Sequence, residues 1–373
     1  MALLMFLFHF VVDFVVAFPA PLSPYFIREY GLDGRTAAMG VAVLAFVGSF
    51  SQVLFAFRKQ EKPWCQSYWG MSFTLIPMLF LVFPLPFLAV FAVFFLIYLA
   101  DGYFHPLGAA LSGVNRGGKG VTAFISGGIL GGALGPVFIT WFVSRYSLRS
   151  LSLVALCILV PLSLWFLRER KPSCELQKAA FSWRFFGILW PIWFMVSSRT
   201  FISAAFHTFV PIYVAEKGYS LLSGGALLTL GVLFGIPANI LGSRMELYLT
   251  NGKLNLLSFL TLGVAVLAFT EAQRLAFLFF FYILADFATF LTMSTNVTEA
   301  QRLLPEHRLF ASSIAMGFAW AFGHALNLLW ASLFGNSALF ILKSIGAIAL
   351  GVALCVVLFE RVATPKSAEV PWE

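Results

Sequence analysis

Charged residues are scarce in this sequence, and their scarcity excludes most classes of soluble protein. Only 11% of the 373 residues are charged, whereas 60% are hydrophobic and 44 are phenylalanine. Soluble domains carry roughly 25% charged residues, so this chain lacks the polar surface that water requires. The net charge of +8 does not indicate a nucleic-acid partner, because lysine and arginine flank the cytoplasmic ends of membrane helices. We therefore predict an integral membrane protein in a lipid bilayer.

Cysteines are few and catalytic motifs are lacking. The four cysteines, Cys65, Cys157, Cys174 and Cys355, show neither paired nor metal-ligand spacing, which argues against a disulfide or a cysteine metal site. No Ser/His/Asp triad, Walker motif or zinc signature occurs. The glycine loop at 115–120 (NRGGKG) lacks the strand–loop–helix context and the Ser/Thr after lysine that a phosphate-binding loop needs. The sequence thus predicts neither an enzyme nor ATP-driven transport, and no cofactor.

Twelve apolar runs are long enough to cross a bilayer as helices of about 20 residues. They cover roughly 3–27, 36–57, 67–84, 86–111, 120–143, 148–167, 186–213, 221–242, 254–271, 275–299, 308–333 and 338–360. The first run has no basic segment before it and continues past Ala20, so we expect a first membrane span and not a cleaved signal peptide. The predicted fold class is an all-α polytopic membrane protein with twelve transmembrane helices.

The loop charges predict the orientation of these spans. With the N-terminus inside, the cytoplasmic loops and tail hold 16 of the 24 lysine and arginine residues, and the outer loops hold 6. Positive charge is enriched on the cytoplasmic side of membrane proteins. We therefore expect both termini in the cytoplasm.

A repeat divides the chain into two halves. Three residues recur after 187 positions: Pro24, Glu29 and Gly31 return as Pro211, Glu216 and Gly218. Residues 120–135 match 308–323 at an offset of 188. We therefore expect two pseudo-symmetric six-helix bundles, at 1–167 and 186–373, joined by a cytoplasmic linker at 168–185. Internal repeats of this kind are typical of secondary transporters, which bind substrate between the halves near the bilayer midplane.

Two pairs of ionisable residues fall inside spans of the first half. His9 and Asp13 are four residues apart in span 1, and Asp101 and His105 repeat this spacing in span 4, so each pair shares a helix face. Ionisable groups are costly in a membrane and need a reason to be there. A histidine beside a carboxylate can exchange a proton near neutral pH, which makes these four residues candidates for proton coupling. The alternative is a static pair that ties helices together.

Other polar residues inside spans are candidates for substrate binding. Arg199, halfway along span 7, would bind an anionic substrate group or pair permanently with Asp13, Asp101 or Asp286. Asp286, central in span 10, is assigned equally to proton coupling and to structure. The remaining candidates that would contact substrate are Asp13, His207, His324, Asn327 and Tyr103.

Small residues and loop charges predict packing and gating. Gly131, Gly135 and Pro136 belong to a glycine face on span 5, which allows close helix packing and a proline kink. The basic glycine loop before it is expected to separate spans 4 and 5 as a cytoplasmic turn. At the turn between spans 10 and 11, a cluster of charges is expected to form inter-helix salt bridges of a gate: Glu299, Arg302, Glu306 and Arg308.

Several of these motifs resemble a known family. Gly131-x-x-x-Gly135-Pro136 resembles the exchanger motif of the major facilitator superfamily, and HFVVD (9–13), FHP (104–106) and residues 299–323 are similar to fosmidomycin-resistance efflux transporters. The resemblance implies the major facilitator fold and proton-driven export of small, often anionic or amphipathic compounds across a bacterial inner membrane. It also implies that Asp13, Asp101, His105 and Arg199 line the cavity.

The sequence departs from this family in its loops. The loop between spans 2 and 3 reads FRKQEKPWCQ, without the glycines and aspartate of the superfamily signature. Only Gly242, Arg244 and Glu246 remain of the same signature between spans 8 and 9. The expected partners are protons and a small-molecule substrate, bound by a monomer.

Two other functions remain open from the sequence. His9, Asp13, Asp101 and His105 offer nitrogen and oxygen ligands, so the cargo would alternatively be a divalent metal or a metabolite. A function of another class is a membrane receptor or assembly subunit that transports nothing.

Overall fold

All predicted spans occur as helices in the computed structural model, which describes residues 2–56, 62–169, 183–304 and 308–363. Within these ranges only the backbone is described at some positions, including Pro106, 113–122 and Arg308. Twelve helical segments of the described chain are long and apolar enough to cross a membrane, which confirms the predicted number. Cys174, Glu306 and most of the predicted linker at 168–185 lie outside the described residues.

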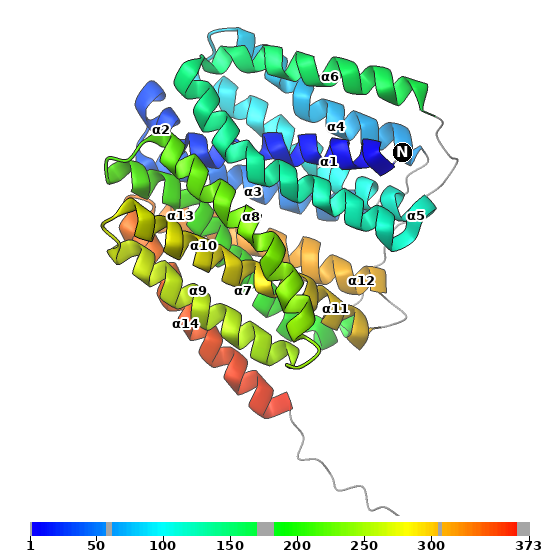
Figure 1. Cartoon of the computed structure of the whole chain (residues 1–373), viewed down its shortest axis with the longest axis vertical. Helices are drawn as coiled ribbons and strands as arrows, with labels where there is room; N and C mark the ends of the chain where they lie inside the picture. Colours follow the sequence, from blue (N-terminus) through cyan, green and yellow to red (C-terminus); the bar gives the residue numbers. More distant parts are fainter. Residues whose placement is uncertain (1, 57–61, 170–182, 305–307, 364–373) are drawn as a thin grey trace, which may run out of the picture.

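The first six spans form one group of helices, which is the upper group in Figure 1. Pro19 opens α2, so span 1 is broken into two helices, as expected where proline lacks an N–H. The elements are α1 (Ala2–Val16), α2 (Pro19–Tyr30), α3 (Gly34–Ala56), α4 (Pro63–Leu79), η1 (Phe80–Val82), α5 (Phe87–Arg145), η2 (Leu148–Ser150) and α6 (Leu151–Arg168).

The last six spans form the lower group. Span 10 is broken at Thr292 and span 11 contains a turn of π-helix, η4. The elements are α7 (Trp183–Glu216), α8 (Leu221–Met245), α9 (Asn251–Glu271), α10 (Leu275–Leu291), α11 (Met293–Leu303), α12 (Arg308–Ser313), η4 (Ile314–Phe318), α13 (Ala319–Phe334) and α14 (Ala338–Ala363).

The buried hydrophobic side chains gather into two clusters. One contains residues between 4 and 166, and the other contains residues between 189 and 356 together with Ala38 and Ala42 of α3. The two groups of helices meet where α5 packs on α8, α3 on α13, and α2 on α7. A hydrogen bond from the backbone N–H of Val137 to Thr229 Oγ1 (3.2 Å) joins α5 to α8. The boundaries 1–167 and 186–373 stay a prediction.

The turn between spans 4 and 5 differs from the expected glycine loop. Helical backbone continues through it, so both spans belong to α5. Two residues 20 positions apart in a straight helix would be about 30 Å apart, yet the rings of Phe104 and Phe124 are 5.8 Å apart. The chain therefore reverses between these residues without a separate loop, and the two arms of α5 pack against each other.

The sequence repeat has a structural meaning at two glycines. Gly31 (φ 66°) and Gly218 (φ 83°) are the residues with positive φ in the described chain, and each ends the first span of its half. Gly218 caps α7, because the N–H of Tyr219 bonds to the carbonyl of Val214 (3.1 Å), as in a Schellman motif. Just past Gly31, the N–H of Thr36 donates to Asp33 Oδ1 (2.6 Å) and holds the pKa of Asp33 below its ordinary value.

We expect Gly218→Ala to destabilise the protein by about 1–2 kcal/mol, because a Cβ disfavours the left-handed conformation. The measurement is a thermal melt of the purified protein in detergent. Gly187→Ala is the matched control: Gly187 lies in α7 with ordinary φ and nothing within 4 Å of an added Cβ, so its melting temperature should stay or rise. Equal melting temperatures for the two variants would contradict the assigned cap.

Candidate functional site

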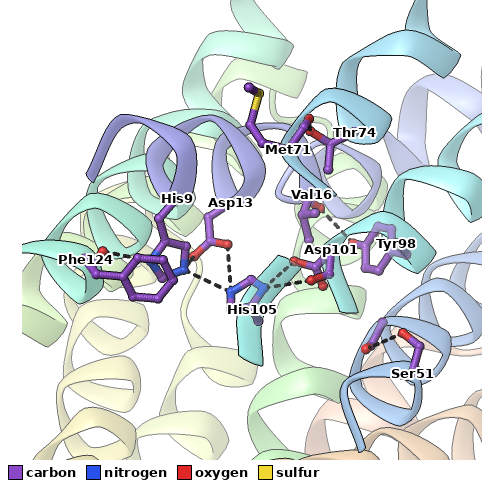
Figure 2. Close-up of polar contacts among 11 residues, drawn as sticks. His9, Asp13, Val16, Ser51, Met71, Thr74, Tyr98, Asp101, His105 and Phe124 are labelled. Carbon is purple, nitrogen blue, oxygen red and sulfur yellow. Dashed lines mark hydrogen bonds and ion pairs between the residues drawn. The ribbon is translucent and has the colours of Figure 1, made fainter. Parts of the chain in front are cut away.

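The two histidine–aspartate pairs of the first half meet in one cluster. α1 presents His9 and Asp13 on successive turns, and the first arm of α5 presents Asp101 and His105 (Figure 2). His105 Nε2 lies 3.0 Å from His9 Nε2 and 3.2 Å from Asp13 Oδ1. His9 Nε2 lies 3.3 Å from Asp13 Oδ2. The structure thus brings all four predicted residues together, in contacts that run between helices as well as along them.

Oxygen atoms fix the far side of each imidazole ring. His9 Nδ1 is 2.7 Å from the backbone carbonyl of Phe124, in the second arm of α5. His105 Nδ1 is 2.9 Å from Asp101 Oδ1 and 3.1 Å from the Asp101 carbonyl. The side chains of Asp13 and His105 are 26% and 24% exposed, whereas His9 and Asp101 are buried. The cluster therefore has a buried back and an accessible front.

The glycine face of α5 sets the position of α1 against this cluster. A Cβ on any of three glycines spaced by four residues would overlap a backbone carbonyl of α1: Gly127 meets Phe6, Gly131 meets Phe10, and Gly135 meets Phe14. The helix backbones therefore touch, as small residues allow in membranes. A Cβ on Gly128 would overlap the His9 ring and the Asp13 carboxyl group, so this glycine leaves the space that the cluster occupies.

A second histidine–aspartate pair lies in the other half. His207 Nε2 of α7 is 2.7 Å from Asp286 Oδ1 of α10. Asp286 is 1% exposed and His207 is 27% exposed, so the histidine stands between the carboxylate and the accessible surface. Asp286 Oδ2 has no hydrogen-bond partner among the described residues. The sequence does not predict this pair, because the two residues are 79 positions apart and share no helix.

Arg199 is a buried cation with no acidic partner among the described residues. It lies in α7, is 5% exposed, and forms no ion pair with any described residue. Its Nη1 atom is buried and has no hydrogen-bond partner among the described residues. The alternative of a permanent pair with Asp13, Asp101 or Asp286 is not observed, because each of these carboxylates lies against a histidine instead.

The other predicted substrate residues have contacts outside the first cluster. Tyr103 packs its ring on Phe55 of α3, with centroids 4.9 Å apart. Asn327 of α13 is fully buried and donates to Thr208 Oγ1 of α7 (3.4 Å). His324 of α13 has a buried Nδ1 without a hydrogen-bond partner in the described chain. Asn327 and His324 thus belong to the half that holds Arg199 and the second pair.

The charges at the turn between spans 10 and 11 differ from the predicted gate. Arg302 Nη2 and Glu299 Oε2 are 2.6 Å apart, but both residues belong to α11, so this salt bridge is within one helix and not between helices. Glu246, just after α8, lies near this salt bridge. Burial raises the pKa of Glu246, and the negative charge of Glu299 raises it further. The side chain of Arg308 lies outside the described part.

Pro136 belongs to the contact between the halves. Its carbonyl accepts a hydrogen bond from Thr140 Oγ1 (2.8 Å). The same carbonyl lies 2.7 Å from the position of a Cβ on Gly225 of α8. The Gly135–Pro136 pair thus packs on α1 at the glycine and on the other half at the proline.

Comparison with known proteins assigns the family. The sequence model of the Major Facilitator Superfamily matches residues 5–326. The chain belongs to this superfamily. It is a membrane transporter with the major facilitator fold, as the resemblance of its motifs implied.

Solved structures share this fold at low sequence identity. A POT family transporter in complex with 5-aminolevulinic acid has a TM-score of 0.81 and 14% identity, over 97% of this chain and 96% of that chain. The peptide transporter POT in complex with sulfate has a TM-score of 0.79 and 14% identity, over 97% and 94%. A bacterial homolog to the human lysosomal transporter Spinster, inward-facing and unoccupied, has a TM-score of 0.70 and 12% identity, over 97% and 94%.

These identities show the fold alone. No curated protein matches the sequence. The finer resemblance to fosmidomycin-resistance transporters, the location in a bacterial inner membrane and the orientation of the termini stay predictions.

Proposed function

We propose that this transporter is a proton-coupled exporter that exchanges protons for a small anionic organic compound by alternating access. The observation that supports proton coupling best is the pair of His207 and Asp286. We assign coupling to this pair because an accessible histidine lies against a buried carboxylate there.

The exposures of the pair suit a proton relay. A histidine can take up or release a proton near neutral pH, and His207 is accessible while Asp286 is enclosed behind it. An uncompensated carboxylate charge is costly inside a membrane. Protonation of the pair neutralises this charge. Binding and release of the proton would therefore favour different arrangements of the two halves, which a coupling step requires.

An anionic substrate would complete the charge balance of the second half. Arg199 is buried and has no acidic partner in the described part of the chain, and an uncompensated buried charge is unfavourable. A carboxylate or phosphonate group would supply the missing partner. Two of the solved relatives were crystallised with 5-aminolevulinic acid and with sulfate, which both carry anionic groups. The direction of transport rests on the resemblance to exporters.

The test is uptake of a radiolabelled phosphonate into proteoliposomes with an acidic lumen. The outward proton gradient should accelerate wild-type uptake, whereas Asp286→Asn should lose this acceleration at least about tenfold, since an amide carries no exchangeable proton near neutral pH. Exchange of phosphonate for phosphonate across the membrane, without a gradient, should persist in the variant.

Asp33→Asn is the control, because asparagine also accepts the Thr36 hydrogen bond and Asp33 is outside the spans. It should behave as wild type in both assays. An Asp286→Asn transporter with undiminished gradient dependence would refute the coupling role. Failure of the wild type to respond to a gradient with any phosphonate or organic acid would refute the proposal as a whole.

A further inference from the structure

The first-half cluster gathers two imidazole nitrogens and a carboxylate at one point. His9 Nδ1 and His105 Nδ1 each lie within hydrogen-bond distance of a backbone carbonyl, 2.7 Å and 3.1 Å away. A carbonyl only accepts, so both Nδ1 atoms carry a proton. In neutral rings both Nε2 atoms then present lone pairs, and these atoms are 3.0 Å apart. The Asp13 carboxylate adds negative charge at the same point, so the three groups repel one another unless a proton on one Nε2 atom or a metal ion lies among them.

We infer that His9, Asp13 and His105 bind a divalent transition metal ion. Their ligand atoms all lie within 4.8 Å of one another. The two Nε2 atoms are 3.0 Å apart, and the two carboxylate oxygens of Asp13 divide between them: Oδ1 lies 3.2 Å from His105 Nε2 and Oδ2 lies 3.3 Å from His9 Nε2. Metal–ligand bonds of about 2.0–2.1 Å in tetrahedral geometry place neighbouring ligand atoms about 3.3 Å apart. Two imidazoles and one carboxylate suit zinc, cobalt, nickel or iron better than calcium or magnesium, which prefer oxygen ligands alone.

The surroundings of the ligands match those of a metal centre. Ligating histidines usually donate their second N–H to a carbonyl or a carboxylate, and here Phe124 and Asp101 occupy these positions. Two neutral histidines, the carboxylates of Asp13 and Asp101 and a divalent ion sum to zero charge. Among the described residues, no lysine or arginine forms an ion pair with either carboxylate.

Space and access also fit. Gly128 faces the His9 ring and the Asp13 carboxyl group with no side chain of its own. With three protein ligands, a fourth position stays open for water or another group. Asp13 and His105 form the accessible front of the cluster, so that position can be reached from outside. The inference goes beyond the proposed function, since metal binding needs no transport.

The test is titration of the purified full-length protein in detergent with Co²⁺ alone, followed by visible absorption, and with Zn²⁺ by calorimetry. We expect one ion per chain, with the strong ligand-field bands of four- or five-coordinate cobalt. His105→Gln and His9→Gln should each abolish these bands. Asp101→Asn keeps all three ligands, and should weaken binding about 10–100-fold, the usual effect of losing a carboxylate that orients a metal-binding histidine.

His324→Gln is the matched control, since it removes a histidine from the other half and should leave cobalt binding unchanged. Each variant is checked by its melting temperature without metal, so that loss of folding is distinguished from loss of binding. Gly128→Ala provides a second test. Its added methyl group fills the space beside His9 and Asp13 without removing a ligand, so the variant should bind cobalt more weakly than wild type. Cobalt binding by wild type that equals binding by His105→Gln would overturn the inference, and would leave the transport proposal untouched.

Discussion

Replacing Gly131 by alanine should force α1 away from the second arm of α5 and destabilise the first half of the transporter. The added Cβ would overlap the carbonyl oxygen of Phe10 and lie 2.9 Å from the backbone N of Phe14. Backbone atoms cannot rotate away as side chains do. Overpacking costs about 1–3 kcal/mol even where side chains adjust, so we expect a loss of at least this size. Helix association in membranes depends on such close contacts.

Gly132 provides a control on the adjacent position of the same helix. Nothing lies within 4 Å of a Cβ added there, so Gly132→Ala should keep or raise the melting temperature through helix propensity. The measurement is thermal unfolding of both variants in the same detergent, monitored by tryptophan fluorescence. If Gly131→Ala and Gly132→Ala have the same melting temperature, α1 and α5 are not in the close contact that forms the cluster.

The number and order of the spans could be predicted from the sequence because hydropathy alone determines them. The break of span 1 follows from Pro19, but the break within span 10 could not be predicted. Thr292 ends α10 with no proline or glycine beside it, and the free N–H of Ser294 is satisfied by Asn239 Oδ1 of α8 (3.1 Å). A partner from another helix makes this break possible. A single stretch of sequence therefore carries no signal for it.

The candidate site divides in the same way. The spacing of His9 and Asp13, and of Asp101 and His105, predicts each pair on one helix face, since four residues make about one helical turn. Contact between the pairs depends on the register of α1 against α5, which the glycines set through backbone contact. The carbonyl of Phe124 has no side-chain signature and could not be predicted at all.

The repeat also fails to indicate the second pair. At the offset of 187, Asp286 corresponds to Leu99 and His207 to Ala20. Each half thus carries its own arrangement of polar groups on a shared backbone. The repeat predicts the fold of both halves, because their hydrophobic patterns agree, and it does not predict the site.

Arg199→Met should make the protein without ligand more stable and weaken its binding of anionic compounds. Methionine fills a similar volume without a charge, and replacing buried charges by apolar residues often stabilises by about 1–4 kcal/mol. Wild-type protein should melt at a higher temperature with a bound phosphonate or 5-aminolevulinic acid, because ligands stabilise the folded state. Loss of a charged hydrogen bond should weaken binding at least about tenfold, so the variant should show a clearly smaller shift at the same ligand concentration.

The opposite changes in stability and in ligand binding make the test decisive about Arg199. If the guanidinium held helices together through an acidic partner, Arg199→Met would leave that acid unpaired. The free energy of unfolding would then fall by several kcal/mol, and the variant would melt at a lower temperature. Arg184→Met is the control, because Arg184 lies in the same helix but is exposed, so neither its stability nor its ligand shift should change appreciably. Higher stability together with weaker binding is the combination expected of a charge that is kept for a substrate and not for the fold.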